Sequence, residues 1–292
     1  MNYQCIDAYQ EVTVSSIEEI YDTIKKYKKF HNLPRPGLSD KEPWVDTFYR
    51  GQSNSEWDIS PSLVRSKTEE SQLLETYMPS KTMSLFEMIA YIQHYHQGTR
   101  FIDFTTNPDV AIYFACSKHN DKNGALYIYT YAPHKAEWYT ATILSELTRV
   151  REKDEISVQE FSEGILKHHP EFKEKFSGIE ELNGAIMSFL DHGFIALPDS
   201  ESYHDNVRLQ KQNGCFYVCG VEFSKALTST SHWFSRAGIN KFKPHSAVVP
   251  DELKRGHNLV KIIIPKDAKA QFLHQLSLNG ITESYLFPPL KK

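Results

Sequence analysis

The chain has 292 residues, of which 40% are hydrophobic, 13% aromatic and 24% charged, a composition that can bury a large core and argues against disorder. Its formal net charge of −4 gives no overall attraction to phosphate backbones or anionic lipid, so any contact with nucleic acid would need a local basic groove. Residues 1–7 lack the pattern of a secretion signal and no apolar run approaches the ~20 residues of a membrane span, so we expect a cytoplasmic protein without membrane contact.

The first elements of the chain are a helix and a short strand. Apolar residues keep helical spacing over residues 15–24, and Ser15 or Ser16 can cap the start of that helix. The next pattern, over residues 45–51, predicts a short strand that ends at a glycine. This strand places Arg50 at its end.

A strand, turn and helix follow a second, buried helix. Apolar spacing predicts that helix over residues 82–97, before a glycine. Residues 101–104 predict a short strand, in which Asp103 and the adjoining Thr105 share one side. The pair Asn107-Pro108 then opens a helix, since proline is favoured in a first helical turn.

The second half of the chain begins with its clearest strand, at residues 125–131. A charged stretch from about 137 to 190 is mainly helical in pattern. Strands are expected again at 214–223 and 259–265, followed by a helix at 268–278. The expected organisation is one α+β domain over residues 1–292, with a helical lead (1–44) and a helical insertion (135–205).

Several familiar kinds of site are not indicated. The four cysteines contain no Cys-x-x-Cys pair, and Cys215 and Cys219 would lie about 13 Å apart on one strand, so we expect reduced core cysteines. The pair His94 and His96 diverges on a helix and has no further ligand at a familiar metal spacing, so we expect no metal. The absence of nucleophile-elbow, P-loop and dinucleotide-binding glycine motifs disfavours hydrolase, NTPase and Rossmann readings.

Arg50 is the first candidate for chemistry. A guanidinium at a strand end can face a cleft, and the neighbouring Gly51 lets a ligand approach the backbone, a combination suited to a phosphate and an amide. The alternative is a structural Arg50–Asp103 ion pair that joins two strands.

Two further groups of polar residues are candidates. Asp103, Thr105 and Thr106 could hold a ribose or order Arg50; the alternative is that Thr106 or Asn107 caps the next helix. Gln212 opens a late strand and could align a substrate hydroxyl, or satisfy a turn. Glu283 is a carboxylate near the end of the chain, where a surface role is the default.

These residues together resemble the FRG domain family, named for the Phe/Tyr-Arg-Gly motif. The resemblance covers roughly residues 45–290 and is specific in combination. The residues that carry it are Phe48–Gly51, Gln93–Tyr95, Thr99–Pro108, Ala111–Ala115, Arg208, Gln212, Gly214, Phe216, Gly280-Ile281 and Leu286–Pro288.

The order of elements is also similar, more weakly, to that of the split-sheet ADP-ribosyltransferases. This similarity implies an α+β fold with a split antiparallel sheet core, surrounding helices and a helical insertion. It implies NAD as the substrate, without a metal, and catalytic roles for Arg50, Thr105, Gln212 and Glu283. The implied NAD-binding residues, with Phe114 as a further pocket wall, are Tyr49, Arg50, Gly51, Gln52, His94, Thr99, Arg100, Asp103, Thr105, Asn107 and Tyr113.

The chain departs from that superfamily at Gln212, which stands where a glutamate is expected. An amide can bind a ribose hydroxyl but cannot stabilise positive charge on the sugar. Either Glu283 or another acid supplies that charge, or the reaction is weak, or the fold binds a nucleotide without turning it over.

Three functions therefore remain open. The first is an NAD-dependent ADP-ribosyltransferase that modifies a protein or nucleic acid, as a bacterial toxin or antiviral effector with an antitoxin or regulatory partner. The second is an NAD glycohydrolase, with water as the acceptor. The third is a non-catalytic module that binds nucleotide or nucleic acid.

Overall fold

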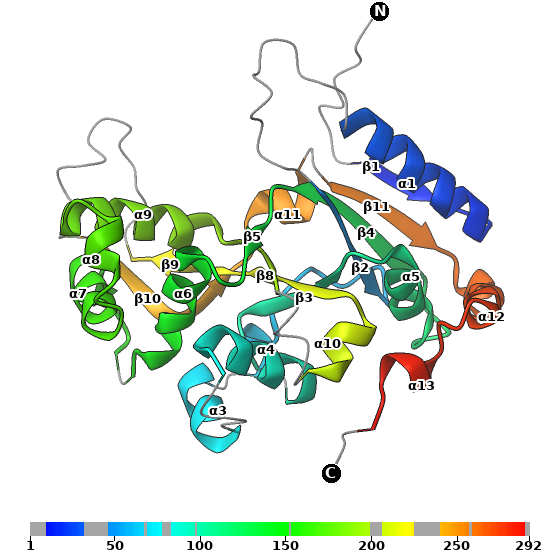
Figure 1. The fold of residues 1–292 in the computed structure, drawn as a ribbon. Coiled ribbons are helices and arrows are strands. Elements are labelled where there is room, and N and C mark those ends of the chain that lie inside the picture. Colours follow the sequence, from blue (N-terminus) through cyan, green and yellow to red (C-terminus); the bar gives the residue numbers. More distant parts are fainter. Residues whose placement is uncertain are drawn as a thin grey trace, which may run out of the picture.

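The computed structural model describes residues 10–31, 46–66, 69–77, 83–96, 98–151, 153–198, 206–224, 240–256 and 259–289. They form a mixed α and β structure in which one long sheet runs through the molecule and helices pack around it (Figure 1). In this part of the chain no helix has the length and apolar character needed to cross a bilayer.

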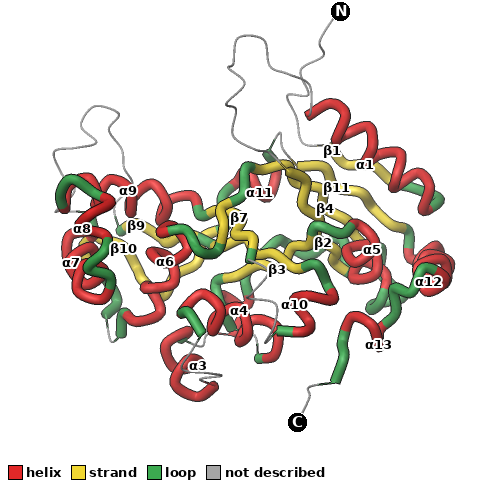
Figure 2. The backbone as a smooth tube through the Cα atoms, viewed as in Figure 1, coloured by secondary structure: helices red, strands yellow, loops and turns green. Residues whose placement is uncertain are grey.

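The main sheet has eight strands in the order β1-β11-β4-β2-β3-β8-β7-β5, and its course is followed in yellow in Figure 2. Neighbouring strands are antiparallel except in the pairs β1–β11 and β5–β7, which are parallel, so the expected wholly antiparallel sheet is corrected to a mixed one. The strands are β1 (Gln10–Thr13), β2 (Asp46–Gln52), β3 (Phe101–Thr105), β4 (Gly124–Tyr131), β5 (His134–Lys135), β7 (Phe194–Leu197), β8 (Gly214–Val218) and β11 (Leu259–Ile264).

A second sheet has three strands, β6 (Ile156–Ser157), β10 (Lys241–Val248) and β9 (Gly220–Phe223), in that order. The strand expected over residues 214–223 is thus two strands, because the chain leaves the main sheet after Val218 and enters the second sheet at Gly220. Cys219 lies at this change of sheet and, like Cys215, is a buried free thiol.

Helices begin where the sequence supplies caps. The Ser16 Oγ accepts from the Glu19 backbone N–H, and Ser84 and Glu87 form a reciprocal capping box. The helices, including the short 3₁₀ turns η1 and η2, are α1 (Ile17–His31), α2 (Ser62–Ser66), α3 (Glu70–Tyr77), α4 (Leu85–Tyr95), α5 (Pro108–Cys116), α6 (Tyr139–Glu146), η1 (Leu147–Arg149), α7 (Val158–His168), α8 (Phe172–Lys175), α9 (Ile179–His192), α10 (Val207–Lys211), α11 (Asp251–Arg255), η2 (Lys266–Ala268), α12 (Lys269–Leu278) and α13 (Glu283–Leu286).

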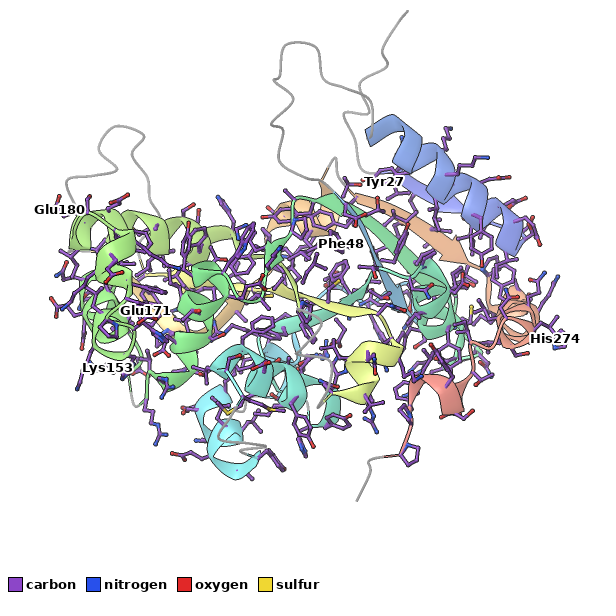
Figure 3. The ribbon with its side chains drawn as sticks, in the orientation of Figure 1. Tyr27, Phe48, Lys153, Glu171, Glu180 and His274 are labelled. Atoms are coloured by element: carbon purple, nitrogen blue, oxygen red, sulfur yellow. The ribbon has the colours of Figure 1, made fainter. Side chains whose placement is uncertain are left out.

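Three regions of the sequence contain more strand than we expected, and one of them is β10. The N-terminal lead includes β1 at the edge of the main sheet as well as α1, while residues 1–9 and 32–45 lie outside the described residues. The segment 135–205 holds α6 to α9 but also β6 and β7, and β7 pairs with β8 inside the main sheet. Lys153, Glu171 and Glu180 lie on the exposed surface of this helical region (Figure 3).

Three apolar clusters make up the core. Alternate residues of β2 and β4 enter different clusters, with Tyr49 and Ile128 packed under α1, α5 and α12, and Phe48 and Tyr129 on the opposite face. A third cluster surrounds Phe216. It joins helices α3, α4 and α6 to α9 to strands β7 and β8 of the main sheet and to β6 and β9, the outer strands of the second sheet. The face of the main sheet that carries Tyr49 is therefore covered by two separate groups of helices. One group is α1, α5 and α12, and the other consists of the helices of the third cluster.

Candidate functional site

The main sheet opens between its two central strands. β2 pairs with β4 at every position from Asp46 to Gln52, whereas β2 and β3 pair at one position, Tyr49 with Thr105. Because β2 and β3 separate on either side of this contact, their backbone groups are not paired with each other there, and side chains can extend across the gap. This is where the cleft lies.

The cleft has two joined parts, which we call the inner and outer lobes. The inner lobe, about 380 Å³, includes Asp103, Thr105 and Gln212 in its wall, and the outer lobe, about 1020 Å³, includes Glu283. Volumes of this order suit a ligand the size of a nucleotide or dinucleotide. The residues that line both lobes are Arg50, Gly51, Trp57, Arg65, Phe114, Lys118 and Phe287.

Arg50 crosses the opening between the strands. Its Nη1 donates a 2.7 Å hydrogen bond to the backbone carbonyl of Asp103, and its buried Nε has no hydrogen-bond partner among the described residues. Burial lowers the pKa of the guanidinium, the charge of Asp103 opposes that shift, and the charge of Arg65 adds to it. The group still carries its charge at neutral pH, since arginine is not deprotonated in proteins.

The alternative of an Arg50–Asp103 ion pair is not what the strands produce. Tyr49 and Thr105 are directly paired and so share a face of the sheet, which puts Asp103 on that face and Arg50 on the other. Arg50 consequently reaches the carbonyl of Asp103 instead of its carboxylate.

Arg65 and Lys118 add positive charge that sequence reasoning missed. Arg65 lies in the last turn of α2 and donates from Nη1 to the Ser60 carbonyl at 2.8 Å. In the described part of the chain, the arginines that pair with a carboxylate are Arg100, Arg149 and Arg151. Arg50 and Arg65 are not among them. No motif surrounds Arg65 or Lys118 that could have pointed to them.

Asp103 presents its carboxylate to the inner lobe. The Gln93 Nε2 donates to Asp103 Oδ2 at 3.0 Å, and the His94 Nε2 lies 3.8 Å from Oδ1. The Asp103 side chain is 53% exposed, while that of His94 is 5% exposed. Burial lowers the pKa of His94, against the opposing charge of Asp103, and Arg208 lowers it further, so the ring is neutral at pH 7.

Thr105 and Gln212 lie together, but their polar groups are engaged. The Thr105 hydroxyl donates to the Gln212 backbone carbonyl at 2.6 Å and accepts from the Asn107 backbone N–H at 3.0 Å. The Gln212 Nε2 donates to the Leu286 carbonyl at 3.1 Å, which ties the start of β8 to α13. Both residues line the inner lobe, and both side chains already make hydrogen bonds to backbone carbonyls.

The outer lobe is rich in aromatic side chains. Phe114 and Phe287 meet edge to face at 5.8 Å, and Trp57 is 45% exposed. Tyr113 lines this lobe beside Glu283: burial raises the pKa of Tyr113, and the charge of Glu283 raises it further. Such walls can stack on a nucleobase or pyridine ring.

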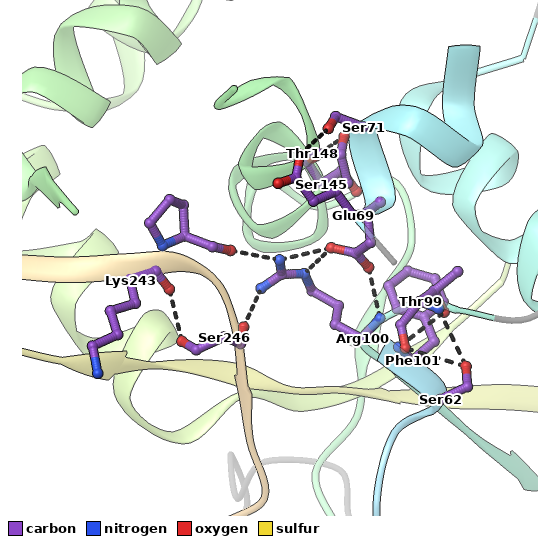
Figure 4. A network of polar contacts seen from close by, with 12 residues as sticks. Ser62, Glu69, Ser71, Thr99, Arg100, Phe101, Ser145, Thr148, Lys243 and Ser246 are labelled. Carbon is purple, nitrogen blue, oxygen red and sulfur yellow. Dashed lines mark hydrogen bonds and ion pairs between the residues drawn. The ribbon is translucent and has the colours of Figure 1, made fainter. Parts of the chain in front are cut away.

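Three of the expected NAD-binding residues, Thr99, Arg100 and Asn107, lie outside both lobes. Arg100 is 1% exposed and pairs with Glu70, with Nε and Nη2 each 2.7 Å from Glu70 Oε2. Figure 4 shows Arg100 within its network of polar contacts. Its Nη2 also donates to the Pro244 carbonyl at 2.9 Å, so it joins β3 to β10. Asn107 caps α5 by accepting from the Asp109 N–H, as the alternative reading proposed.

Gly51 and Gln52 line the cleft, but the glycine serves packing first. A Cβ at Gly51 would lie 1.9 Å from the Ala111 carbonyl oxygen, so only glycine lets β2 pass this close to α5. Gln52 lines the outer lobe and donates weakly, at 3.4 Å, to the Asp58 carbonyl.

A buried lysine fixes the rim of the outer lobe. The Lys269 Nζ donates to the carbonyls of Ser53, Lys118 and His119 at 2.7, 3.0 and 3.0 Å. The first carbonyl follows β2 and the other two follow α5, so one ammonium group holds two loops of the cleft together. Lys269 is 1% exposed.

The fold and the cleft define a mixed α+β protein with a ligand-sized site where two central strands separate. Residues 45–124 match the family model described as the FRG domain, so the chain contains an FRG domain over that segment and the family resemblance is confirmed. The match runs from β2 to the start of β4, and Gln212 and Glu283 lie beyond it. No curated protein and no solved structure gives a significant match to the chain.

Proposed function

We propose that the cleft binds NAD and that the protein is an NAD-dependent ADP-ribosyltransferase acting on a protein or nucleic acid. The observation that carries this proposal is the convergence of Arg50, Asp103, Thr105 and Gln212, from distant parts of the sequence, on one inner lobe, with Glu283 in the adjoining outer lobe. Chemistry-bearing residues that gather in a cleft from separate segments are more typical of a ligand site than of a structural network.

The split in the sheet supports the ADP-ribosyltransferase-like architecture as part of this proposal. A split-sheet enzyme holds its dinucleotide where two strands diverge, and β2 and β3 share a single paired position. Arg50 and Asp103 lie on these two strands. The presence of a cleft between these two strands supports the proposed architecture.

The charges and rings of the cleft suit the parts of NAD. Arg50 and Arg65 have no carboxylate partner within the described residues, so both are suited to phosphate oxygens, with Lys118 as a third cation. Trp57 and Phe287 offer surfaces for ring stacking. The reaction would break the nicotinamide–ribose bond of the held dinucleotide.

We extend the proposal to a bacterial toxin or antiviral effector that acts in the cytoplasm under the control of an antitoxin or another regulatory partner. The support is the superfamily resemblance, together with three free buried thiols, Cys116, Cys215 and Cys219, which suit a reducing compartment.

A second candidate is a module that binds a nucleotide without turning it over. The Thr105 hydroxyl, which donates to the Gln212 carbonyl, and the uncharged side chain of Gln212, which donates to the Leu286 carbonyl, favour it.

The test is incubation of the protein with NAD labelled in its adenylate phosphate and with cell extract. We expect wild type to transfer label to protein or nucleic acid, and Arg50→Ala to lose roughly 100-fold of this activity. Arg151→Ala is the matched control, since Arg151 is an exposed arginine outside the cleft that pairs with Glu75.

The outcomes separate the candidates. Equal labelling by wild type and Arg50→Ala contradicts the proposal. Free ADP-ribose without labelled macromolecule identifies NAD glycohydrolase activity. Thermal stabilisation of wild type by ADP-ribose, with neither product formed, identifies the non-catalytic module.

A further inference from the structure

The inner lobe has one acidic side chain in its wall. Among the described residues that line it, Asp103 is the only carboxylate, whereas Arg50, Arg65 and Lys118 are cationic. Glu283 lines the outer lobe but not the inner one. A positive charge that develops on a ligand inside the inner lobe would therefore face Asp103 before any other acid.

The Asp103 carboxylate is held in position by a buried polar network. The Gln93 Nε2 donates to its Oδ2 at 3.0 Å, and the Gln93 Oε1 accepts from the Thr99 Oγ1 at 2.6 Å and the Ser62 Oγ at 3.2 Å. Gln93, Thr99 and Ser62 are all buried. Thr99 therefore lies behind the cleft and orients Gln93, which is part of the cleft wall.

The Asp103 side chain is exposed enough to contact a ligand. It is 53% exposed, although Gln93 fixes one carboxylate oxygen and His94 is 3.8 Å from the other. Because His94 is buried and its pKa is lowered, it does not neutralise Asp103 at pH 7. Gln212 cannot substitute, since it is uncharged and its amide donates to the Leu286 carbonyl.

We propose that Asp103 is the catalytic carboxylate that stabilises positive charge on the ribose, in place of the glutamate that Gln212 replaces. This inference rests on the proposed reaction with NAD. In this arrangement Arg50, Arg65 and Lys118 hold the phosphates of NAD, and Asp103, the carboxylate of the inner lobe, faces the ribose. Gln93 is then a positioning residue, which acts through its hydrogen bond to Asp103.

The step balances without a further reagent. The bond between ribose C1′ and the nicotinamide nitrogen breaks, and its electron pair moves to that nitrogen, which leaves as neutral nicotinamide. The positive charge passes to C1′ and the ring oxygen of the ribose, where a nearby carboxylate lowers its energy. An oxygen or nitrogen of the acceptor then bonds to C1′ and releases its proton to water.

The first measurement compares the kinetics of nicotinamide release. Asp103→Asn keeps an oxygen that can accept from Gln93 but removes the charge, so we expect kcat to fall by roughly 100- to 1000-fold with KM changed less than about threefold. Asp154→Asn, at an exposed position of the helical region, is the control and keeps wild-type rates. Unchanged kcat in Asp103→Asn overturns the assignment.

The second measurement does not depend on turnover. An ADP-ribose analogue whose terminal ribose is replaced by a protonated pyrrolidine carries the same charge at the sugar. We expect wild type to bind this analogue at least about tenfold more tightly than ADP-ribose, and Asp103→Asn to bind the two equally.

The pair of measurements separates this inference from the proposed function. If the analogue is preferred through Asp103 but NAD is not consumed, the carboxylate is assigned correctly and the transferase proposal fails. If NAD is consumed and Asp103→Asn keeps the preference, or Glu283→Gln abolishes it instead, the assignment to Asp103 is overturned and the transferase proposal stands.

Discussion

The Arg50 guanidinium is hydrogen-bonded to the backbone carbonyl of Asp103, at 2.7 Å, across the opening between β2 and β3. Those strands share one paired position, Tyr49 with Thr105, so the arginine provides a second link between them. The residue that we propose to contact the phosphates therefore also sets the spacing of the cleft walls.

Arg65 should contribute to binding as a second phosphate contact. We expect Arg65→Gln to weaken ADP-ribose binding by at least about tenfold, because a hydrogen bond between charged groups contributes about 1.5–3 kcal/mol. Isothermal titration calorimetry measures the affinity, and Arg151→Gln, outside the cleft, should bind as wild type does. Equal affinities for Arg65→Gln and wild type would place the phosphates elsewhere.

Gly51→Ala should destabilise the fold, since its Cβ would lie 1.9 Å from the Ala111 carbonyl oxygen and 2.7 Å from the Ala115 nitrogen, which are backbone atoms of α5. We expect a loss of about 3 kcal/mol or more in the free energy of unfolding, measured in urea. Gly164→Ala is the matched control: it lies within α7 with no atom within 4 Å of the new Cβ, and should stabilise by about 0.5–1 kcal/mol. Equal effects at the two positions would contradict the close approach of β2 and α5.

Lys269→Met should loosen the rim of the outer lobe. The substitution leaves the carbonyls of Ser53, Lys118 and His119 without the ammonium donor, and we expect a loss of about 3 kcal/mol in the free energy of unfolding. Lys266→Met, at an exposed position one turn earlier, should change it by less than about 0.5 kcal/mol. Similar urea midpoints for the two variants would show that the three hydrogen bonds contribute little.

His94 should make stability depend on pH in the acid range. Its pKa is lowered in the folded state, by burial first, from an ordinary value of 6.5, so the unfolded chain binds more protons just below that pH. The stabilisation of the folded state by neutral, buried His94 is then fully present above pH 6.5 and is lost as the pH falls. We expect the melting temperature of wild type to fall more steeply from pH 7.5 to 5 than that of His94→Gln; parallel curves would exclude the effect.

Much of the fold follows from local patterns. Capping residues and apolar spacing predicted α1, α4 and α5, and β-branched and aromatic runs predicted β4 and β11. β1 was missed because four mostly exposed residues give no apolar signal, and β10 because Pro244 argues against a strand. The change of sheet at Cys219 has no local signal, since both sheets bury that run.

The site was predictable where it coincides with the family motif and not elsewhere. Arg50 was found because it precedes a glycine in a predicted strand, and Asp103 because it shares one side of a short strand with Thr105. Arg65 lies on a short helix whose position depends on tertiary packing, which no local pattern encodes. Arg100 was expected to bind the ligand but is buried and paired with Glu70, because a motif gathers structural and ligand-facing residues alike and only burial separates them.

The contacts of Lys269 and Phe287 have a consequence for biosynthesis. The first residue holds together loops that lie 150 to 216 positions earlier in the chain, and the second lines both lobes. A nascent polypeptide cannot complete this cavity until these late residues have left the ribosome. A partially translated chain would therefore lack a complete cavity, which forms only after α12 and Phe287 have been synthesised.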